Sequence, residues 1–283
     1  MSDIDITLAG LGLHPIKSCA ALAPREALLV ETGLDLDRAW MVVDPQGAML
    51  TQRVQPRLAL VRPTLRLSDL LLKAPGMLGL HLSLDTVEKP TRAQVWGDLV
   101  KAWDMGDLAA QWFSDFLGTA ARVVRFDPDQ QRLADRRWTG EQAAPVEFAD
   151  GFPLLLASTA SLGDLNQRLA EAGEAPVGMN RFRPNLVLSG LQPWDEDHLD
   201  VLEIDTEDGP VRLKLVKPCS RCQIPNVDPA SGAMQGEPGR TLSGFRADSR
   251  LGGAVTFGMN AIVLEGIGRT LRVGQRGSAS FAF

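Results

Sequence analysis

Apolar and polar residues alternate along much of the N-terminal part of the chain. Ile4, Ile6 and Leu8 are separated by polar or small residues, and the apolar residues of 93–96 follow the same rule. A period of two places every second side chain on one face of a strand, so this pattern predicts β-strands. Glycine and proline interrupt the pattern often, as in 44–47, which predicts short strands joined by turns.

Two segments follow a helical period instead. In the first, apolar residues recur every three or four positions, and we expect Asp107 to cap the helix and Gly118 to end it. The second helix is expected to begin at Ser158 or Thr159 and to end before Gly173. The apolar faces of the two helices consist of Leu108, Ala109, Trp112, Phe113, Phe116 and Leu117, and of Leu162, Leu165 and Leu169.

Strand patterns return in the C-terminal part, after a polar segment without clear period at 127–145 that we interpret as a connection between domains. Many short strands with two isolated helices favour a β-barrel-like architecture over a βαβ series. We therefore expect a mainly β protein with a few helices, of the α+β class, divided into residues 1–128 and 129–283. The C-terminal strands are expected at 185–188, 198–204, 211–216, 255–257, 261–264 and 271–273.

Composition and charge narrow the classes of function. The chain is 45% apolar and 23% charged, as soluble globular proteins are. Its net charge of −6 opposes nucleic-acid binding by a general basic surface, but leaves room for a local cationic pocket. The first ten residues resemble no secretory signal, and no apolar run approaches the roughly 20 residues that span a bilayer. We expect a cytoplasmic protein with neither a nucleic-acid nor a membrane partner.

Common catalytic motifs are missing from the sequence. Gly10 and Gly12 are followed by Pro15 where a dinucleotide-binding fingerprint needs a third glycine. The sequence has no phosphate-binding P-loop, no H-E-x-x-H and no G-x-S-x-G. Histidine occurs only at 14, 81 and 198, and a lone histidine is more often a packing or surface residue than a catalytic one.

Two cysteines stand in a short segment that follows a strand-like alternation. Cys219 and Cys222 have the spacing Cys-x-x-Cys, and Lys217 and Arg221 beside them favour thiolate over thiol. A structural zinc site needs four ligands, and a second pair is missing. A redox dithiol normally opens a helix in a βαβ unit, which this segment does not. The remaining alternative is a pair of buried cysteines without chemical function.

Basic residues also recur in short, separated clusters. Lys17, Arg38 and Arg53 lie in the N-terminal part, and Arg181 and Arg183 follow the second predicted helix. Each is set among apolar or turn residues. Taken singly, such cations most often extend to the surface. Several of them near strand ends can also converge on one anion, for which arginine offers fixed, bidentate geometry.

Spaced motifs along nearly the whole chain resemble a known family. Residues 217–232, with Arg221-Cys222 and a following Val-Asp-Pro, resemble the cysteine motif of MOSC domains. Residues 15–19 resemble the β-barrel domain that precedes MOSC in one branch, that of the mitochondrial amidoxime-reducing component and its bacterial relatives. The other matching segments are 33–34, 37–40, 96–98, the helix around Trp112, 158–166 and 181–185.

The resemblance implies an N-terminal MOSC β-barrel domain at 1–128 and a MOSC domain, itself a β-barrel, at 129–283. The cofactor it implies is a molybdenum–molybdopterin whose metal takes one protein thiolate. The matching position is Cys222, as metal ligand and catalytic residue. Asp228 either relays protons in catalysis or simply holds an Asp-Pro turn. The implied contacts to the cofactor's phosphate and ring edges are Lys17, Ser18, Arg38, Arg53, Ser158, Arg183, Asn185 and Cys222.

The implied activity is two-electron reduction of small N-hydroxylated compounds. The chain ends at Phe283, and three cysteines cannot supply the four ligands of an iron–sulfur cluster. Electrons are therefore expected from a separate donor protein of the flavin or iron–sulfur type. The alternatives are a non-catalytic carrier of the cofactor or of persulfide sulfur, and a zinc-stapled binding module. Because Arg38 is expected to pair with the ligand, its removal should weaken cofactor retention with little effect on folding.

Overall fold

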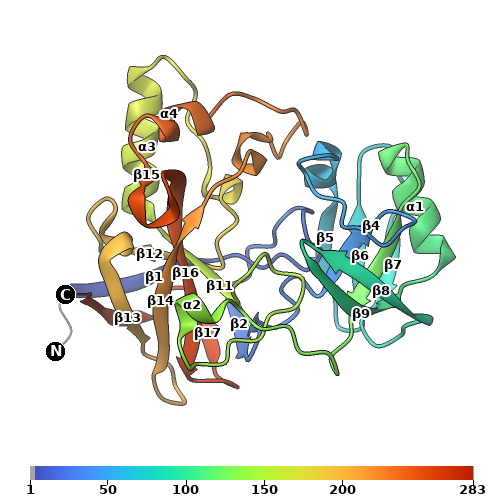
Figure 1. Ribbon diagram of the computed structural model, residues 1–283, viewed down its shortest axis with the longest axis horizontal. Helices are drawn as coiled ribbons and strands as arrows, with labels where there is room; N and C mark the ends of the chain where they lie inside the picture. Colours follow the sequence, from blue (N-terminus) through green and yellow to red (C-terminus); the bar gives the residue numbers. More distant parts are fainter. Residues whose placement is uncertain (1–3, 283) are drawn as a thin grey trace.

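A computed structural model describes residues 4–282 of the chain. Figure 1 shows two lobes, a larger one built on a barrel and a smaller one of short sheets with one long helix. Strands outnumber helices in both lobes, and the larger sheet closes on itself. The predicted mainly β fold with a barrel is thus confirmed.

Seven strands close the barrel, because the first and last of them, β11 and β16, pair with each other. The β11–β12 pair is parallel and the other neighbours are antiparallel. The two-residue strand β15 (Ala247–Asp248) adds to β16 outside the ring. The order around the barrel is β11 (Leu154–Ser158), β12 (Leu186–Ser189), β1 (Ile4–Leu11), β18 (Arg276–Phe281), β13 (Leu199–Ile204), β14 (Val211–Ser220) and β16 (Ala254–Glu265).

The core of the barrel is built by apolar residues at every second position of its strands. On β14, Val211, Leu213 and Leu215 are buried, whereas Arg212 and Lys214 between them are exposed. The inward side chains of all seven strands meet in one apolar cluster, whose burial stabilises the barrel. Other strands contribute Leu8, Leu156, Leu188, Leu202, Ala261 and Ala279 to it.

The smaller lobe consists of two sheets and helix α1 (Asp107–Leu117). Trp112, Phe113 and Phe116 of α1 are buried in the apolar cluster of this lobe. One sheet has the order β4 (Trp40–Val43), β10 (Arg122–Phe126), β9 (Asp98–Asp104) and β8 (Lys89–Val95), and the other the order β5 (Arg62–Leu65), β6 (Asp69–Lys73) and β7 (Leu80–Ser83).

The start of the chain belongs to the barrel lobe. Strand β1 pairs with β12 and β18, and β2 (Glu26–Val30) pairs with β3 (Gly33–Leu34) and with β17 (Thr270–Arg272). Gly33 has a φ of +112°, and a Cβ there would lie 2.3 Å from the carbonyl oxygen of Pro153. The barrel lobe thus draws strands from both sides of the predicted boundary at residue 128, and the division into two domains stays a prediction.

The helix ends test the predicted caps. Gly106, with a φ of +93°, is the cap residue of α1, and the expected cap, Asp107, is the first residue of the helix. Asp104 accepts a hydrogen bond from the backbone N–H of Gly106 at 2.8 Å. The expected end of α1 at Gly118 is confirmed by its left-handed backbone. Helix α3 (Thr159–Glu171) begins as predicted, with Ser158 as its cap, and stops before Gly173.

The predicted C-terminal strands are present, with two differences. The expected strands 255–257 and 261–264 are one strand, β16, which passes through Gly258 at a φ of +77°. Strands β11 and β18 were not predicted. In β18, small residues such as Gly277 and Ala279 hide the alternation, and a Cβ on Gly277 would lie 2.1 Å from the carbonyl oxygen of Glu203 on β13.

Short helices fill the connections. The segment 127–145, expected to be irregular, contains the one-turn helix α2 (Arg136–Thr139). None of the helices within residues 4–282 is long and apolar enough to cross a membrane. The remaining short helices are η1 (Pro56–Leu60), η2 (Met179–Arg181), η3 (Asp195–His198), η4 (Ile224–Asn226), α4 (Gly239–Ser243) and η5 (Ser249–Leu251).

Candidate functional site

A pocket of about 130 Å³ lies where the two lobes meet, and we call it the interlobe pocket. Five cationic side chains line it, namely Lys17, Arg38, Arg53, Arg183 and Arg221, against one acidic residue, Asp150. Such an excess of positive charge in a chain of net charge −6 favours an anionic ligand. Seven of the residues predicted from sequence line the pocket: Lys17, Ser18, Arg38, Arg53, Arg183, Asn185 and Cys222.

Three of the lining residues have a backbone conformation that side chains disfavour. The φ angles of Ser18, Arg38 and Arg183 are +69°, +57° and +58°. A non-glycine residue in this left-handed region costs about 1–3 kcal/mol and persists where the surrounding structure holds it. Backbone strain gathers at functional sites, and here it lies at three residues around one pocket.

Arg38 joins the two lobes across the pocket. Its guanidinium forms an ion pair with the buried Asp37 and donates to Asn185 Oδ1 and to the carbonyl oxygen of Arg183, both at 3.1 Å. Asn185 in turn donates to the carbonyl oxygen of Gly12 at 3.2 Å. Arg38 therefore has protein partners as well as a place in the pocket, contrary to the expectation that its partner belongs to the ligand.

Asp37 and His14 lie directly behind Arg38. Burial alone would raise the pKa of Asp37, but Arg38 and His14 lower it well below its usual range. Burial, together with the positive charges of Arg38 and Arg183, lowers the pKa of His14 to about 3. His14 is therefore neutral at physiological pH, and Asp37 is the charge that balances Arg38.

Lys17 is held by the segment that follows β10 in the chain. Its ammonium donates to the carbonyl oxygen of Phe148 at 2.8 Å and forms an ion pair with Asp150. The neighbouring protein partly desolvates the exposed Asp150 carboxylate, which would raise its pKa, but the Lys17 ammonium outweighs this effect, so the pKa of Asp150 lies well below its usual range. Trp96 donates to Asp150 at 3.2 Å, and Arg53 lies over the Trp96 ring at 4.5 Å from its centre.

Two arginines at the pocket have a buried nitrogen that lacks a partner among the residues that the structure describes. Arg183 donates to the carbonyl oxygen of Cys19 at 2.6 Å, but its buried Nη2 has no hydrogen-bond partner among the described residues. Arg221 donates to the carbonyl oxygen of Phe182 at 2.9 Å, and its buried Nε is likewise unpaired within residues 4–282. Buried polar atoms are nearly always hydrogen-bonded, so these donors call for a ligand or water.

The three cysteines differ in their surroundings. Cys19 is buried, and burial raises the pKa of its thiol to about 12. Cys219 lies at the end of β14 and accepts a hydrogen bond from Arg221 Nη1 at 3.1 Å. Cys222 is exposed, lines the pocket and accepts from the backbone N–H of Ile224 at 3.4 Å. Cys222 is thus the most accessible thiol in the pocket.

A metal ion at Cys222 would depend on ligands from outside the chain. Among residues 4–282, no group of three or more histidine, cysteine, aspartate or glutamate side chains lies close enough to hold a metal. A cofactor that carries its own metal ligands and an anionic group matches this donor set, since the pocket offers one free thiol and an excess of cations.

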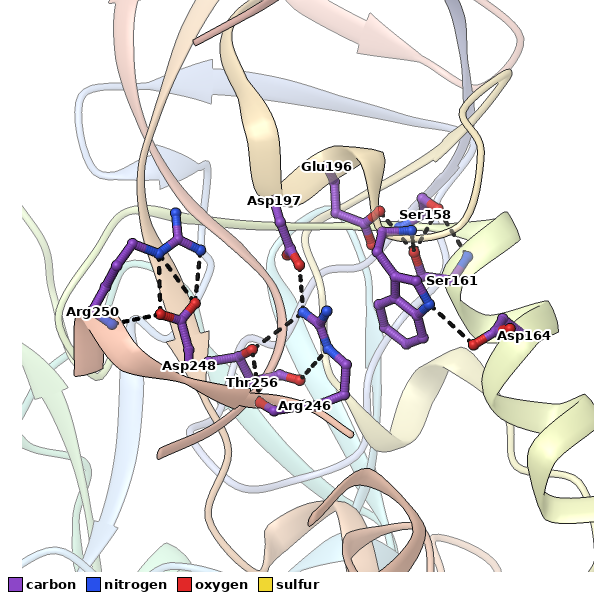
Figure 2. Close-up of polar contacts among 10 residues, drawn as sticks. Ser158, Ser161, Asp164, Glu196, Asp197, Arg246, Asp248, Arg250 and Thr256 are labelled. Carbon is purple, nitrogen blue, oxygen red and sulfur yellow. Dashed lines mark hydrogen bonds and ion pairs between the residues drawn. The ribbon is translucent and has the colours of Figure 1, made fainter. Parts of the chain in front are cut away.

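Ser158 lies outside the interlobe pocket. It caps α3 by accepting from the backbone N–H of Ser161 at 3.0 Å, and the Ser161 hydroxyl donates to the buried Glu196 at 2.7 Å (Figure 2). Nearby, Arg246 pairs with Asp197 and Arg250 pairs with Asp248 (Figure 2). We call Ser158, Ser161, Glu196, Asp197, Arg246, Asp248, Arg250 and Thr256 the barrel-side cluster.

Asp228 also lies outside the interlobe pocket. It accepts from the backbone N–H of Ala230 at 2.9 Å and from the hydroxyl of Ser231 at 3.0 Å. These bonds, the first above all, lower the pKa of Asp228. The carboxylate holds its own turn, and a role of Asp228 in proton transfer stays a prediction.

Sequence reasoning missed several pocket residues. Asp150 pairs with Lys17 across 133 positions of the chain, and no local motif marks it. Ser220 and Arg221 lie inside the cysteine segment, which gave a signal for them. The other lining residues not predicted include Thr51, Phe152, Phe182 and Asn260.

Comparisons with known proteins identify two family domains along the chain. Residues 5–120 match the MOSC N-terminal beta barrel domain, and residues 143–276 match the MOSC domain. The chain is 38% identical to mitochondrial amidoxime reducing component 2 of Rattus norvegicus, over 95% of this chain and 82% of that protein. It is 36% identical to the human mitochondrial amidoxime-reducing component 1, over 95% of this chain and 81% of the relative.

A third relative is the molybdenum cofactor sulfurase of Danio rerio, 32% identical over 89% of this chain but only 31% of that protein. Two family domains match in order, and the chain covers most of the length of the two amidoxime-reducing components. Together these matches define the class of protein. The chain belongs to the MOSC-domain proteins and carries the N-terminal beta barrel domain of that family.

Proposed function

We propose that the protein is a molybdenum-cofactor-dependent reductase of small N-hydroxylated compounds. Electrons come from a separate donor protein of the flavin or iron–sulfur type, in the cytoplasm. The observation that carries the proposal is the exposed Cys222 thiol in a pocket where cations from both lobes meet. The names of the relatives, amidoxime-reducing components, supply the class of substrate.

The pocket residues would hold the cofactor by its metal and its anionic end. Cys222 would bind the molybdenum through its thiolate. Lys17, Arg38, Arg53 and Arg183 would surround the phosphate, each charge-assisted hydrogen bond contributing about 1.5–3 kcal/mol. When bound, the cofactor supplies a two-electron redox centre that removes the oxygen of an N–OH group. Ser18 and Asn185 complete the polar wall.

The chain's own residues would orient the cofactor and neutralise its negative charge. Because Asp37 and Asp150 hold Arg38 and Lys17 in place, these cations have little conformational freedom to lose when an anion binds. Reduction of the N–OH group consumes two electrons and two protons and releases water. His14 is neutral and buried behind the pocket, so it does not supply these protons.

The test is activity and metal content of protein purified from a molybdenum-replete host. The protein should reduce benzamidoxime with reduced viologen and should not oxidise NADH or NADPH alone. Cys222→Ser should lose molybdenum and activity, whereas the matched variant Cys219→Ser should keep most of both. Equal losses in the two variants would indicate a dithiol or zinc site, and would contradict the proposal.

The match to a cofactor sulfurase favours one second candidate, a carrier of the cofactor or of persulfide sulfur. The exposed Cys222 would then bear the persulfide. The same preparation distinguishes the two functions. A carrier shows a persulfide on Cys222 by mass spectrometry, exchangeable with thiols, and no turnover of benzamidoxime, whereas the reductase turns over without one.

A further inference from the structure

A second pocket, of about 520 Å³, lies beside the interlobe pocket, and we call it the side pocket. Arg183 and Ile224 line both pockets, so the two pockets adjoin at this shared wall. Ile224 follows Cys222 by two positions, and its backbone N–H donates to the Cys222 sulfur at 3.4 Å. A molecule in the side pocket therefore lies next to the thiol that would bind the metal.

The charge of the side pocket is opposite to that of the chain. Arg62, Arg181 and Arg183 line it, and none of its lining residues is acidic. The whole chain has a net charge of −6, so this is a local concentration of positive charge. A concave site lined by one sign of charge attracts a ligand of the opposite sign.

The two arginines away from the wall differ in their partners. Arg181 donates to the carbonyl oxygen of Pro225 at 3.2 Å and to Gln235 Oε1 at 2.9 Å. Burial lowers the pKa of Arg181, and Asp228, the acidic group that acts on it, opposes this shift. The donors of Arg181 thus hold the loop that follows Cys222.

Arg62, in contrast, has its donors free. Its backbone belongs to β5, which pairs with β6, but its exposed guanidinium makes no hydrogen bond, ion pair or ring contact with any residue between 4 and 282. Thr64, two positions further on the same strand, lies on the same face and also lines the pocket. A guanidinium and a hydroxyl side by side form a donor pair that suits a carboxylate.

We propose that the side pocket binds the carboxylate of a small N-hydroxylated substrate, with Arg62 as the residue that recognises it. The N–OH end of the substrate then lies at the wall formed by Arg183 and Ile224, next to Cys222. Val227 and Pro229 line the same pocket and contact the apolar part of the molecule. This inference rests on the proposed function and adds a substrate class, N-hydroxylated acids.

The first experiment compares two substrates in the purified holoprotein with reduced viologen as donor. The wild-type protein should prefer 4-carboxybenzamidoxime to benzamidoxime in kcat/KM. Arg62→Gln should lower kcat/KM for the carboxylated compound about tenfold, mainly through KM, which corresponds to about 1.4 kcal/mol. Reduction of benzamidoxime should stay within about twofold, since one exposed charge contributes little to a neutral ligand.

Arg66→Gln is the matched control, because Arg66 is exposed near the end of the same strand and does not line the pocket. It should leave both substrates unaffected, and Arg62→Lys should restore part of the preference. A KM for 4-carboxybenzamidoxime that is unchanged in Arg62→Gln would overturn the proposal. If Arg62→Gln is slower only when a protein supplies the electrons, and not with reduced viologen, Arg62 would belong to a docking site for the donor. That result would also overturn the proposal.

A second measurement separates this proposal from the proposed function, since it needs no turnover. Calorimetry with 4-carbamoylbenzoate, which cannot be reduced, should show binding to the wild-type holoprotein that is weakened about tenfold in Arg62→Gln. Benzamide should bind both proteins equally weakly. If the protein reduces no N-hydroxylated compound, the proposed function fails while this binding difference stands. Equal binding of 4-carbamoylbenzoate to both proteins, or no binding to either, would refute the carboxylate site.

Discussion

Two polar regions of this protein bring charged side chains together, and they differ in the balance of charge. The barrel-side cluster pairs Arg246 with Asp197 and Arg250 with Asp248, all within the barrel lobe (Figure 2). The interlobe pocket gathers five cations from both lobes against two carboxylates, that of Asp150 in its lining and that of Asp37 behind Arg38. The barrel-side cluster has no cationic surplus, since its two guanidiniums are outnumbered by the carboxylates of Glu196, Asp197 and Asp248, whereas the interlobe pocket keeps a surplus of positive charge.

Unpaired buried atoms alone do not separate the two regions. Arg183 Nη2 lacks a partner at the interlobe pocket, and Asp197 Oδ1 lacks one in the barrel-side cluster, among the residues that the structure describes. Left-handed backbone does not separate them either, since it occurs at Ser18 and Arg38 in the pocket and at Trp194 beside the barrel-side cluster, so the surplus of positive charge is what distinguishes the pocket. The balance of charge is therefore a better guide to a ligand site here than unsatisfied atoms.

The largest expected effect comes from breaking one buried ion pair in each region. Arg38→Ala leaves Asp37 buried and unpaired, and Arg246→Ala does the same to Asp197. Each variant should lower the free energy of unfolding by about 3–5 kcal/mol, measured by urea titration. Of the two, only Arg38→Ala should also lower molybdenum content per folded chain. Full stability of Arg38→Ala would show that its role is confined to the ligand.

A smaller effect concerns pH, and two groups near Asp37 act in opposite directions. The pKa of His14 falls from 6.5 to about 3 on folding, so the unfolded chain binds the proton and stability is lost as pH falls below 6.5. Burial raises the pKa of Glu147 from 4.5 to about 7, with Asp37 and Asp35 adding to it against Arg125. Stability from this group is lost as pH rises from 4.5 through 7.

The two contributions largely cancel in the wild-type protein, and single variants separate them. Between pH 7 and 5, wild type should lose about 2 kcal/mol of unfolding free energy relative to His14→Gln, from linkage. Over the same range wild type should gain stability relative to Glu147→Gln. Urea unfolding of the three proteins at several pH values measures both differences. Parallel curves for wild type and His14→Gln would show that folding does not shift the pKa of His14.

The smallest expected effect compares one serine from each region. Ser158→Ala removes the cap of α3 and should cost about 1 kcal/mol, with molybdenum content unchanged. Ser18→Ala should change the free energy of unfolding less than Ser158→Ala does, and should lower molybdenum content. Ser158 was predicted from sequence as a cofactor contact, so loss of molybdenum in Ser158→Ala would support that prediction over the separation of the two regions.

Much of the site could be predicted from sequence because its residues lie in compact motifs. Lys17 and Ser18 are adjacent, Arg183 and Asn185 share one turn, and Cys222 has a distinctive segment around it. The period of two likewise predicted β14, where apolar and charged residues alternate. Strand β18 was missed because its glycine, serine and alanine residues carry little hydrophobic contrast.

The partners of these residues could not be predicted in the same way. Asp150 and Lys17 meet across 133 positions, and Arg38 and Asn185 meet across 147. Such contacts follow from how the lobes pack, which no local pattern shows. The expectation that Arg38 serves the ligand alone was therefore wrong, since it also holds Asp37, Asn185 and the backbone of Arg183.

We propose that both lobes hold one anionic molybdenum cofactor. The most direct measurement is molybdenum and pterin per folded chain after dialysis, in wild type, Arg53→Gln and Arg183→Gln, with Arg250→Gln as the control from the barrel-side cluster. Arg53 comes from the smaller lobe and Arg183 from the barrel lobe, and each lines the interlobe pocket. Both variants should retain several-fold less cofactor than wild type, whereas Arg250→Gln should retain as much. Full retention in Arg53→Gln and Arg183→Gln would contradict the claim.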